Sequence, residues 1–424
     1  MPGREVVRRV LAVAGMLALG FLTVVGVVHG QPVAAPVTTP PTSAGAPREA
    51  LDVAAVDALL ATRARAVSDD DRAAWAGTVA PVAQPLQGQV FDRLRVLRPV
   101  RWTYTRVGEP VRAGATRMRV DVRLTYELAD GGPTVTRPQT WVLQLDGGPK
   151  VLSTASTATP DLWDLTPVVR RTANARTDTG DARCTVVAAA SRRPVATQLV
   201  DLCPDVLDTV QKAVRAPGAD RAPVTLVVPQ DVGQLATLLG RTDPAGLDRT
   251  AAITVGVAHQ PAEAVLINPE AFGQLRAVGR RVVLTHELVH VATRAVEAGG
   301  TATVPTWLDE GTADEIAYAA TDLDAETIAG PVLDQARAGR YPTRLPTSAA
   351  FDATGAAPDL AYAQAWSAAD TIEADKGVAG LLKVHRLVAG GTSLDAALQQ
   401  VLGTGTAGFV SMWQQHLGRL VQNP

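Results

Sequence analysis

The stretch "VVLTHELVHVA", residues 282–292, places two histidines four positions apart, with a glutamate directly after the first, in otherwise apolar surroundings. On an α-helix this spacing puts His286 and His290 on one face, about 6 Å apart along the axis. Both imidazoles can then bind one Zn²⁺, and Glu287, one position further round the helix, lies beside the metal. A core helix with two incidental histidines is the alternative. The joint occurrence of three such residues, in a chain with only six histidines, favours the zinc site.

A catalytic zinc ion takes three protein ligands and leaves a fourth position for water, so this motif needs one more partner. A histidine six residues after the second one would supply it, but Val296 occupies that position. The next candidate is Glu310, within "VPTWLDEGTADEIAY", residues 304–318, a segment whose sequence predicts a helix. Asp309 is the alternative ligand, although it lies about 100° away from Glu310 around such a helix.

"THELVH" followed by "WLDEGTADEIAY" resembles the gluzincin metallopeptidases, and most closely the peptidase MA-like domains of bacterial surface proteins. This resemblance implies that His286, His290 and Glu310 bind one zinc ion per chain and that Glu287 is the general base. It also implies that the carboxylate of Asp314 holds one of the histidine ligands in the correct tautomer. An ordinary solvated charge on the helix is the alternative at that position.

The resemblance extends more weakly to the helical end of the chain. In related enzymes a tyrosine or histidine beyond the third ligand stabilises the negative charge on the reacting carbonyl oxygen. By its place in the helical region Tyr362 is the best candidate, and Tyr341 and His385 are the alternatives. We therefore expect Tyr362 to be a catalytic residue beside Glu287.

Gluzincins also bind substrate along an exposed strand just before the active-site helix, which here implies the segment 264–268. Ala264 and Val265 are the expected contacts with a peptide or protein substrate. The net charge of −2, from 40 basic and 42 acidic residues, gives no indication of a nucleic-acid partner.

The N-terminus has the pattern of an export signal. Three arginines within the first nine residues precede an uncharged run over residues 10–28. This run is close to the roughly 20 residues that span a bilayer, so we expect a signal anchor within residues 1–30, with the rest of the chain outside the cell membrane. A signal peptide cleaved after Gly30 or Ala35 is the alternative. Residues 31–48, rich in proline, alanine and threonine, predict a linker.

A length of 424 residues suggests two or three domains. Residues 49–160 show helical spacing followed by three segments that alternate polar and apolar side chains, at 101–107, 116–128 and 140–148. This order resembles the NTF2-like fold. We expect a scaffold domain, and binding of a small ligand is the alternative.

Residues 161–183 predict a strap between domains, and residues 184–424 predict the metallopeptidase domain. Alternating strands and helices lead up to the zinc motif, and the chain after Trp307 is mostly helical in pattern. The expected fold class is therefore α+β, with an NTF2-like domain, a small mixed sheet, the active-site helix and a helical C-terminal part. The two cysteines, Cys184 and Cys203, predict a disulfide in an exported chain, and two buried free thiols are the alternative.

These features together predict an exported, membrane-anchored zinc metallopeptidase. Because no motif resembles the loop with which aminopeptidases bind a substrate N-terminus, the sequence favours an endopeptidase. Two other classes remain: a zinc-stabilised surface scaffold without turnover, and an NTF2-like ligand-binding protein. Retention of Glu287 argues against the scaffold, because a purely structural zinc site does not need a general base.

Overall fold

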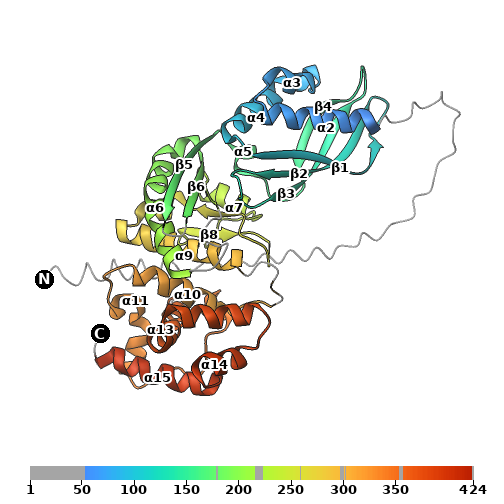
Figure 1. The fold of residues 1–424 in the computed structure, drawn as a ribbon. Coiled ribbons are helices and arrows are strands. Elements are labelled where there is room, and N and C mark those ends of the chain that lie inside the picture. The colour runs from blue at the N-terminus through green and yellow to red at the C-terminus, as the bar shows by residue number, and fades with distance from the viewer. Residues whose placement is uncertain are drawn as a thin grey trace.

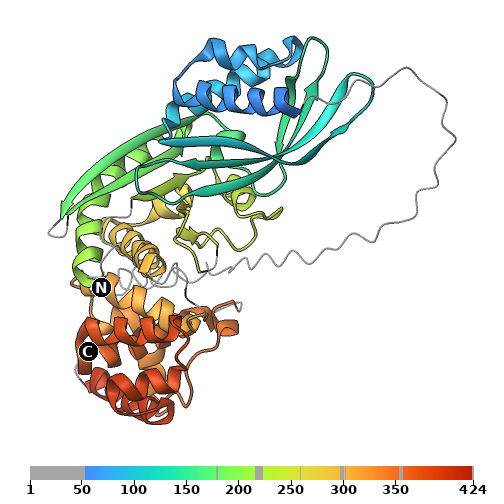
Figure 2. The same ribbon diagram turned by 45° about the vertical axis from the view of Figure 1, so that its right-hand side comes forward.

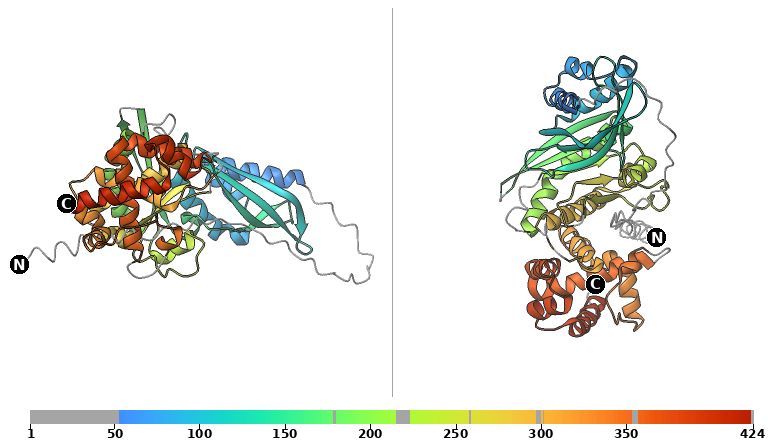
Figure 3. Two further views of the ribbon diagram at one scale, coloured as in Figure 1. Left: turned by 90° about the horizontal axis from the view of Figure 1, so that it is seen from below. Right: turned by 90° about the vertical axis from the view of Figure 1, so that its right-hand side faces the viewer.

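The computed structural model describes residues 53–177, 180–214, 223–257, 259–296, 300, 302–352 and 357–422. None of the helices in these ranges is long and apolar enough to cross a membrane. The anchor expected at 10–28 and the linker expected at 31–48 lie outside the described residues. Figures 1 and 3 show three tiers in chain order: a first sheet with its helices, a second sheet, and a group of helices.

The first tier packs helices against an antiparallel sheet. Its strands follow the order β1-β2-β3-β4. Alternate side chains of β2 are buried, as expected for a sheet with one face covered. Helix α2 covers this face, with Val56 and Leu60 in one apolar cluster with Val120 and Trp141. The elements are α2 (Val53–Ser68), α3 (Arg72–Gly77), α4 (Gln84–Leu97), β1 (Arg101–Arg112), β2 (Arg117–Glu127), β3 (Val135–Gln144) and β4 (Lys150–Ser156).

The expected order of helices followed by an antiparallel sheet is present in this tier, but the NTF2-like identity of residues 49–160 stays a prediction. Helix α4 and strand β4 were not predicted from the sequence.

The second tier is a mixed sheet of order β5-β6-β7-β9-β8. The β6-β7 and β7-β9 pairs are parallel, and the two outer pairs are antiparallel. Helix α6 packs on this sheet beside α9, and both contribute to one apolar core with the strands. The elements are α5 (Leu162–Leu165), β5 (Val168–Thr177), β6 (Gly180–Ala189), α6 (Arg193–Val214), β7 (Val224–Val228), α7 (Val232–Leu238), β8 (Ala252–Val255), β9 (Ala264–Ile267) and α8 (Pro269–Gln274).

The segment 161–183, expected as a strap, instead forms α5, the whole of β5 and the start of β6. Among the described strands, β5 lies at the edge of the sheet and pairs only with β6. Its sequence "VVRRTANART" has polar residues on both faces beyond the first two valines, so it lacks the apolar alternation that marks a half-buried strand. Pairing with β6, rather than its own pattern, makes this segment a strand.

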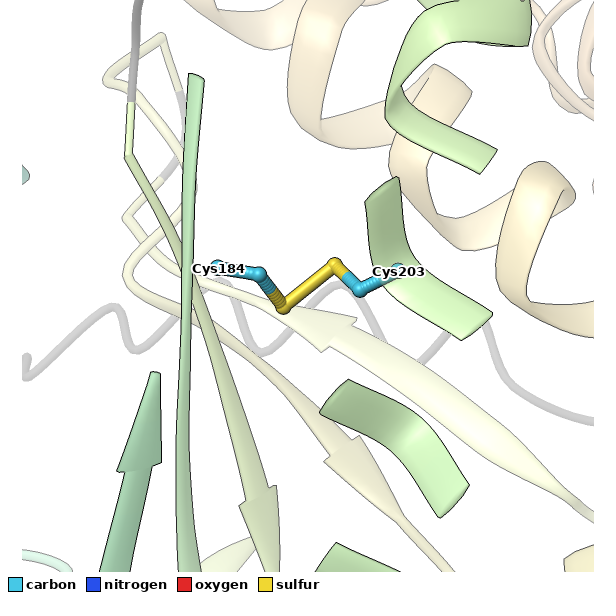
Figure 4. The surroundings of a disulfide bond; sticks show 2 residues. All are labelled: Cys184 and Cys203. Carbon is cyan, nitrogen blue, oxygen red and sulfur yellow. A yellow bond between two sulfur atoms is a disulfide. The ribbon is translucent and has the colours of Figure 1, made fainter. Parts of the chain in front are cut away.

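A disulfide joins Cys184 on β6 to Cys203 on α6, with their Cα atoms 6.4 Å apart (Figure 4). The predicted pairing is therefore confirmed. Both cysteines are fully buried in the core between the sheet and its helix. A bond that closes a 19-residue separation contributes about 3 kcal/mol in the chain-entropy model.

The third tier is helical, and α9 lies between it and the second sheet (Figure 2). Helix α10 packs on α9 on one side and on α13 on the other. Trp307 and Phe409 stack in the core of this tier. The elements are α9 (Ala277–Val296), α10 (Thr306–Ala319), α11 (Ala325–Arg337), α12 (Ser348–Phe351), α13 (Ala357–Ala389), α14 (Leu394–Leu402) and α15 (Thr406–Gln422).

Candidate active site

Helices α9 and α10 bring together the three expected metal ligands. His286 and His290 lie on α9, and Glu310 lies on α10. One potential ligand atom from each of them lies within 4.8 Å of the other two, and all three side chains are buried. We call these three residues the zinc site.

The ring nitrogens of the histidines are oriented by carboxylates from α10. Nδ1 of His286 lies 2.9 Å from Oδ1 of Asp314, and Nδ1 of His290 lies 3.4 Å from Oδ1 of Asp309. With the proton on Nδ1 in each ring, both Nε2 lone pairs are available to a metal. These two Nε2 atoms are 3.1 Å apart, and Nε2 of His286 lies 3.3 Å from Oε2 of Glu310.

These atoms fit a cation. Oε1 of Glu310 is buried and has no hydrogen-bond partner in the described part of the chain, although it lies only 3.8 Å from Nε2 of His290. A buried, unpaired carboxylate oxygen costs free energy that a bound cation removes. Two histidines with one glutamate form a donor set typical of catalytic zinc. The site therefore fits a zinc cofactor, held by His286, His290 and Glu310.

The carboxylates also shift the pKa values of the histidines. Burial lowers the pKa of His286, but the nearby carboxylates of Asp314 and Glu310 outweigh it and raise this pKa well above the ordinary value. Burial likewise lowers the pKa of His290, but the carboxylate of Asp309 outweighs it, so this pKa is also raised. The negative charge gathered around the two rings favours a positive charge between them, which zinc supplies.

Asp309 and His385 lie together behind the zinc site, which their sequence positions did not predict. Asp309 was considered as a ligand, but its carboxylate contacts Nδ1 of His290 and, at 3.1 Å, Nε2 of His385 on α13. His385, considered as an oxyanion donor, is fully buried and lies in this chain of contacts behind the zinc site. The contact between Asp309 and His385 can be seen only in the folded structure, because the two residues are 76 positions apart in the sequence.

Glu287 lies beside the zinc site but is not part of its ligand cluster. The hydroxyl of Thr254 on β8 donates to Oε2 of Glu287 at 2.6 Å. This contact fixes the direction of the carboxylate without removing its negative charge. Thr254 had no signal in the sequence, because a threonine in a short strand is unremarkable by itself.

Tyr362 lies on α13, buried, within electrostatic reach of the site. Burial raises its pKa well above the ordinary value, and the carboxylates of Glu310, Asp314 and Glu287 add to the shift. The phenol therefore keeps its proton at neutral pH and can donate it in a hydrogen bond. Tyr341, the other tyrosine considered, is exposed in the segment after α11.

The expected substrate contacts at Ala264 and Val265 are wrong in one respect: their strand, β9, is not an edge. It pairs with β7 on one side and with β8 on the other. Val265 is completely buried. The chain reverses from β8 to β9 as an antiparallel pair, which leaves the earlier strand, β8, at the edge of the sheet beside α9.

A glycine after the third ligand lets α10 approach α13 closely. A Cβ atom on Gly311 would clash with the carbonyl oxygen of Ala365 and lie 3.1 Å from Cβ of Ala369. The close approach positions Glu310 and Asp309 between α9 and α13. Glu310 therefore supplies a ligand, and Gly311 directly after it allows the helices to pack closely.

Comparison with known families identifies a match in the second half of the chain. Residues 250–419 match the family model of the Peptidase MA superfamily. The match covers β8, β9, α9, α10 and the helical tier, which include every residue of the zinc site. Together with the donor set, it supports a gluzincin-type peptidase domain that uses zinc.

Solved structures give weaker likenesses. The chain is 15% identical to an M1 zinc metallopeptidase from Deinococcus radiodurans, with a TM-score of 0.35, covering 76% of this chain and 61% of that one. It is 13% identical to aminopeptidase A from Legionella pneumophila, with a TM-score of 0.34, covering 73% and 32%. This chain thus spans about three fifths and one third of their lengths. No curated protein matches the chain.

Proposed function

We propose that this chain is an exported zinc metallopeptidase that hydrolyses peptide bonds, with Glu287 as the general base. The observation that carries the proposal is the position of Glu287. Its carboxylate lies outside the ligand cluster, is held by Thr254, and follows directly after His286 on α9. A zinc site that only stabilises the fold does not need a carboxylate that lies beside the three ligands without binding the metal.

Each residue has a distinct role in this proposal. Zinc held by His286, His290 and Glu310 would polarise the scissile carbonyl and acidify a water molecule. Glu287 takes the proton from that water and later delivers it to the leaving amine. The phenol of Tyr362 donates a hydrogen bond to the carbonyl oxygen as negative charge develops there.

The substrate would lie along β8. This strand ends the sheet, and its residue Thr254 contacts Glu287, so a peptide paired with the free edge of β8 would pass beside the general base. Cleavage within a peptide, rather than at its N-terminus, remains our proposal from the sequence. Export and membrane attachment are proposed from the arginine-led apolar run at 10–28, and the disulfide agrees with an oxidising compartment.

Glu287→Gln tests the proposal, because it keeps the size of the side chain and removes the base. Hydrolysis of a peptide library should fall by about 10²–10⁴-fold, whereas bound zinc stays near one ion per chain. Glu109→Gln, at an exposed glutamate on β1, is the matched control and should retain full activity. Comparison of peptide termini at the cell surface between wild type and Glu287→Gln would then identify the substrates.

Equal hydrolysis by wild type and Glu287→Gln would refute the role of Glu287. Absence of any cleavage by the zinc-loaded wild type would favour a surface scaffold instead. Release of single N-terminal residues, without internal cleavage, would replace the endopeptidase assignment with an aminopeptidase one.

A further inference from the structure

A second cluster of carboxylates lies in the helical tier, separate from the zinc site. Glu315 on α10 and two residues of α13, Asp370 and Glu373, each place a carboxylate oxygen within 4.8 Å of the other two. None of the three takes part in the proposed reaction. Carboxylates at this distance repel one another unless protons or a cation neutralise them.

The surroundings of Glu315 indicate that this cluster binds a ligand. Its side chain is buried, with only 6% of the residue exposed, and its Oε2 atom has no hydrogen-bond partner among the residues that the structure describes. Burial, followed by the charges of Asp370 and Glu373, raises the pKa of Glu315 to about 8. The indole N–H of Trp366 lowers this pKa only in part. A buried carboxylate grouped with two further carboxylates, and with one oxygen left unpaired, has the environment of a cation ligand.

The other two carboxylates are partly exposed, so water can reach the cluster. Asp370 also connects it to α15, because Nε2 of His416 lies 2.5 Å from its Oδ2. Arg419 donates to Nδ1 of the same histidine at 3.0 Å, which leaves the ring proton on Nε2, facing Asp370. The sequence predicted a surface or loop position for His416. It is instead buried at this junction, because α15 packs on α13.

We propose that Glu315, Asp370 and Glu373 form a second metal site, which binds Ca²⁺. Ligands that are all oxygen select hard cations over zinc. Calcium accepts six to eight oxygens in an irregular arrangement and completes its coordination with water, whereas magnesium requires a nearly ideal octahedron. Three carboxylates from two helices, open to solvent on one side, therefore suit calcium best.

The site would hold the helical tier together. Calcium would join α10 to α13, and Asp370 would pass the restraint to α15 through His416. Helix α10 also carries Glu310 and Asp314, so the ion would stabilise the helix that supplies the third zinc ligand. The role of the calcium is structural, and it does not depend on whether the chain is a peptidase.

Thermal unfolding of the full-length, zinc-loaded chain tests the proposal without an activity assay. Calcium at about 100 times its Kd should raise the Tm by roughly 3–5 °C, because a ligand that binds only the folded state stabilises it. Titration calorimetry with Ca²⁺ should give one site per chain. Mg²⁺ at the same concentration should produce a clearly smaller shift.

Glu373→Gln should abolish the calcium-dependent shift, because it removes the partly exposed ligand with the least disturbance of the core. Glu315→Gln should also abolish it, because it removes the buried ligand. Asp375→Asn is the matched control. Its exposed carboxylate lies on the same helix, two positions from Glu373 and next to its partner Lys376, and the full shift should remain.

An unchanged wild-type Tm in calcium would overturn the proposal, and would mean that the three carboxylates share protons instead. A calcium shift of equal size in Glu373→Gln and Asp375→Asn would place the ion elsewhere and would overturn it as well. A shift produced by Zn²⁺ but not by Ca²⁺ would contradict the assignment to a hard cation.

Discussion

Removal of the carboxylate of Asp314 should weaken zinc binding without removing a zinc ligand. In Asp314→Ala the Nδ1–H group of His286 loses an acceptor 2.9 Å away, in a place where both side chains are only 4% exposed. A buried donor left unpaired costs about 1–3 kcal/mol. Loss of such an outer partner of a metal ligand typically reduces affinity 10–100-fold, or about 1.4–2.7 kcal/mol. The two ranges overlap, so we expect the zinc Kd to rise 10–100-fold.

Competition with a chelator of known affinity measures this Kd. Asp314→Asn keeps an oxygen that can accept from Nδ1–H but lacks the charge, so its Kd should fall between those of Asp314→Ala and wild type. Asp322→Ala removes an exposed carboxylate just beyond α10 and serves as the control. A Kd for Asp314→Ala within twofold of wild type would show that Asp314 does not set the tautomer of His286.

Two further predictions concern Thr254 and Asp161. Thr254→Val removes the donor to Glu287, and a hydrogen bond to a charged group contributes about 1.5–3 kcal/mol, so kcat/KM should fall about 10–100-fold with zinc content unchanged. Full activity in this variant would mean that Glu287 is oriented by other contacts. Burial raises the pKa of Asp161 to about 6, despite the charge of Arg137. Because this pKa is raised on folding, its stabilisation of about 3 kcal/mol is present below about pH 4 and lost as the pH rises through 6. Tm measured against pH should show this loss in wild type, and Asp161→Asn should not show it.

The sequence alone determined the features that depend on spacing within one helix or on composition. Two histidines four positions apart lie on the same face of any helix, so the two histidine positions could be read directly. The alternation of strands and helices before the zinc motif was predicted because buried strands carry apolar runs. The disulfide was predicted because only one pairing of two cysteines exists.

Only the tertiary structure decided which residues from other elements meet these histidines. Asp309 and Glu310 are adjacent in the sequence, and either could have been the third ligand. The packing of α10 between α9 and α13 directs Glu310 toward both Nε2 atoms and Asp309 toward Nδ1 of His290 and toward His385. The edge position of β8 and the contact of Thr254 with Glu287 likewise depend on strand order, which the period of side chains within a single strand does not encode.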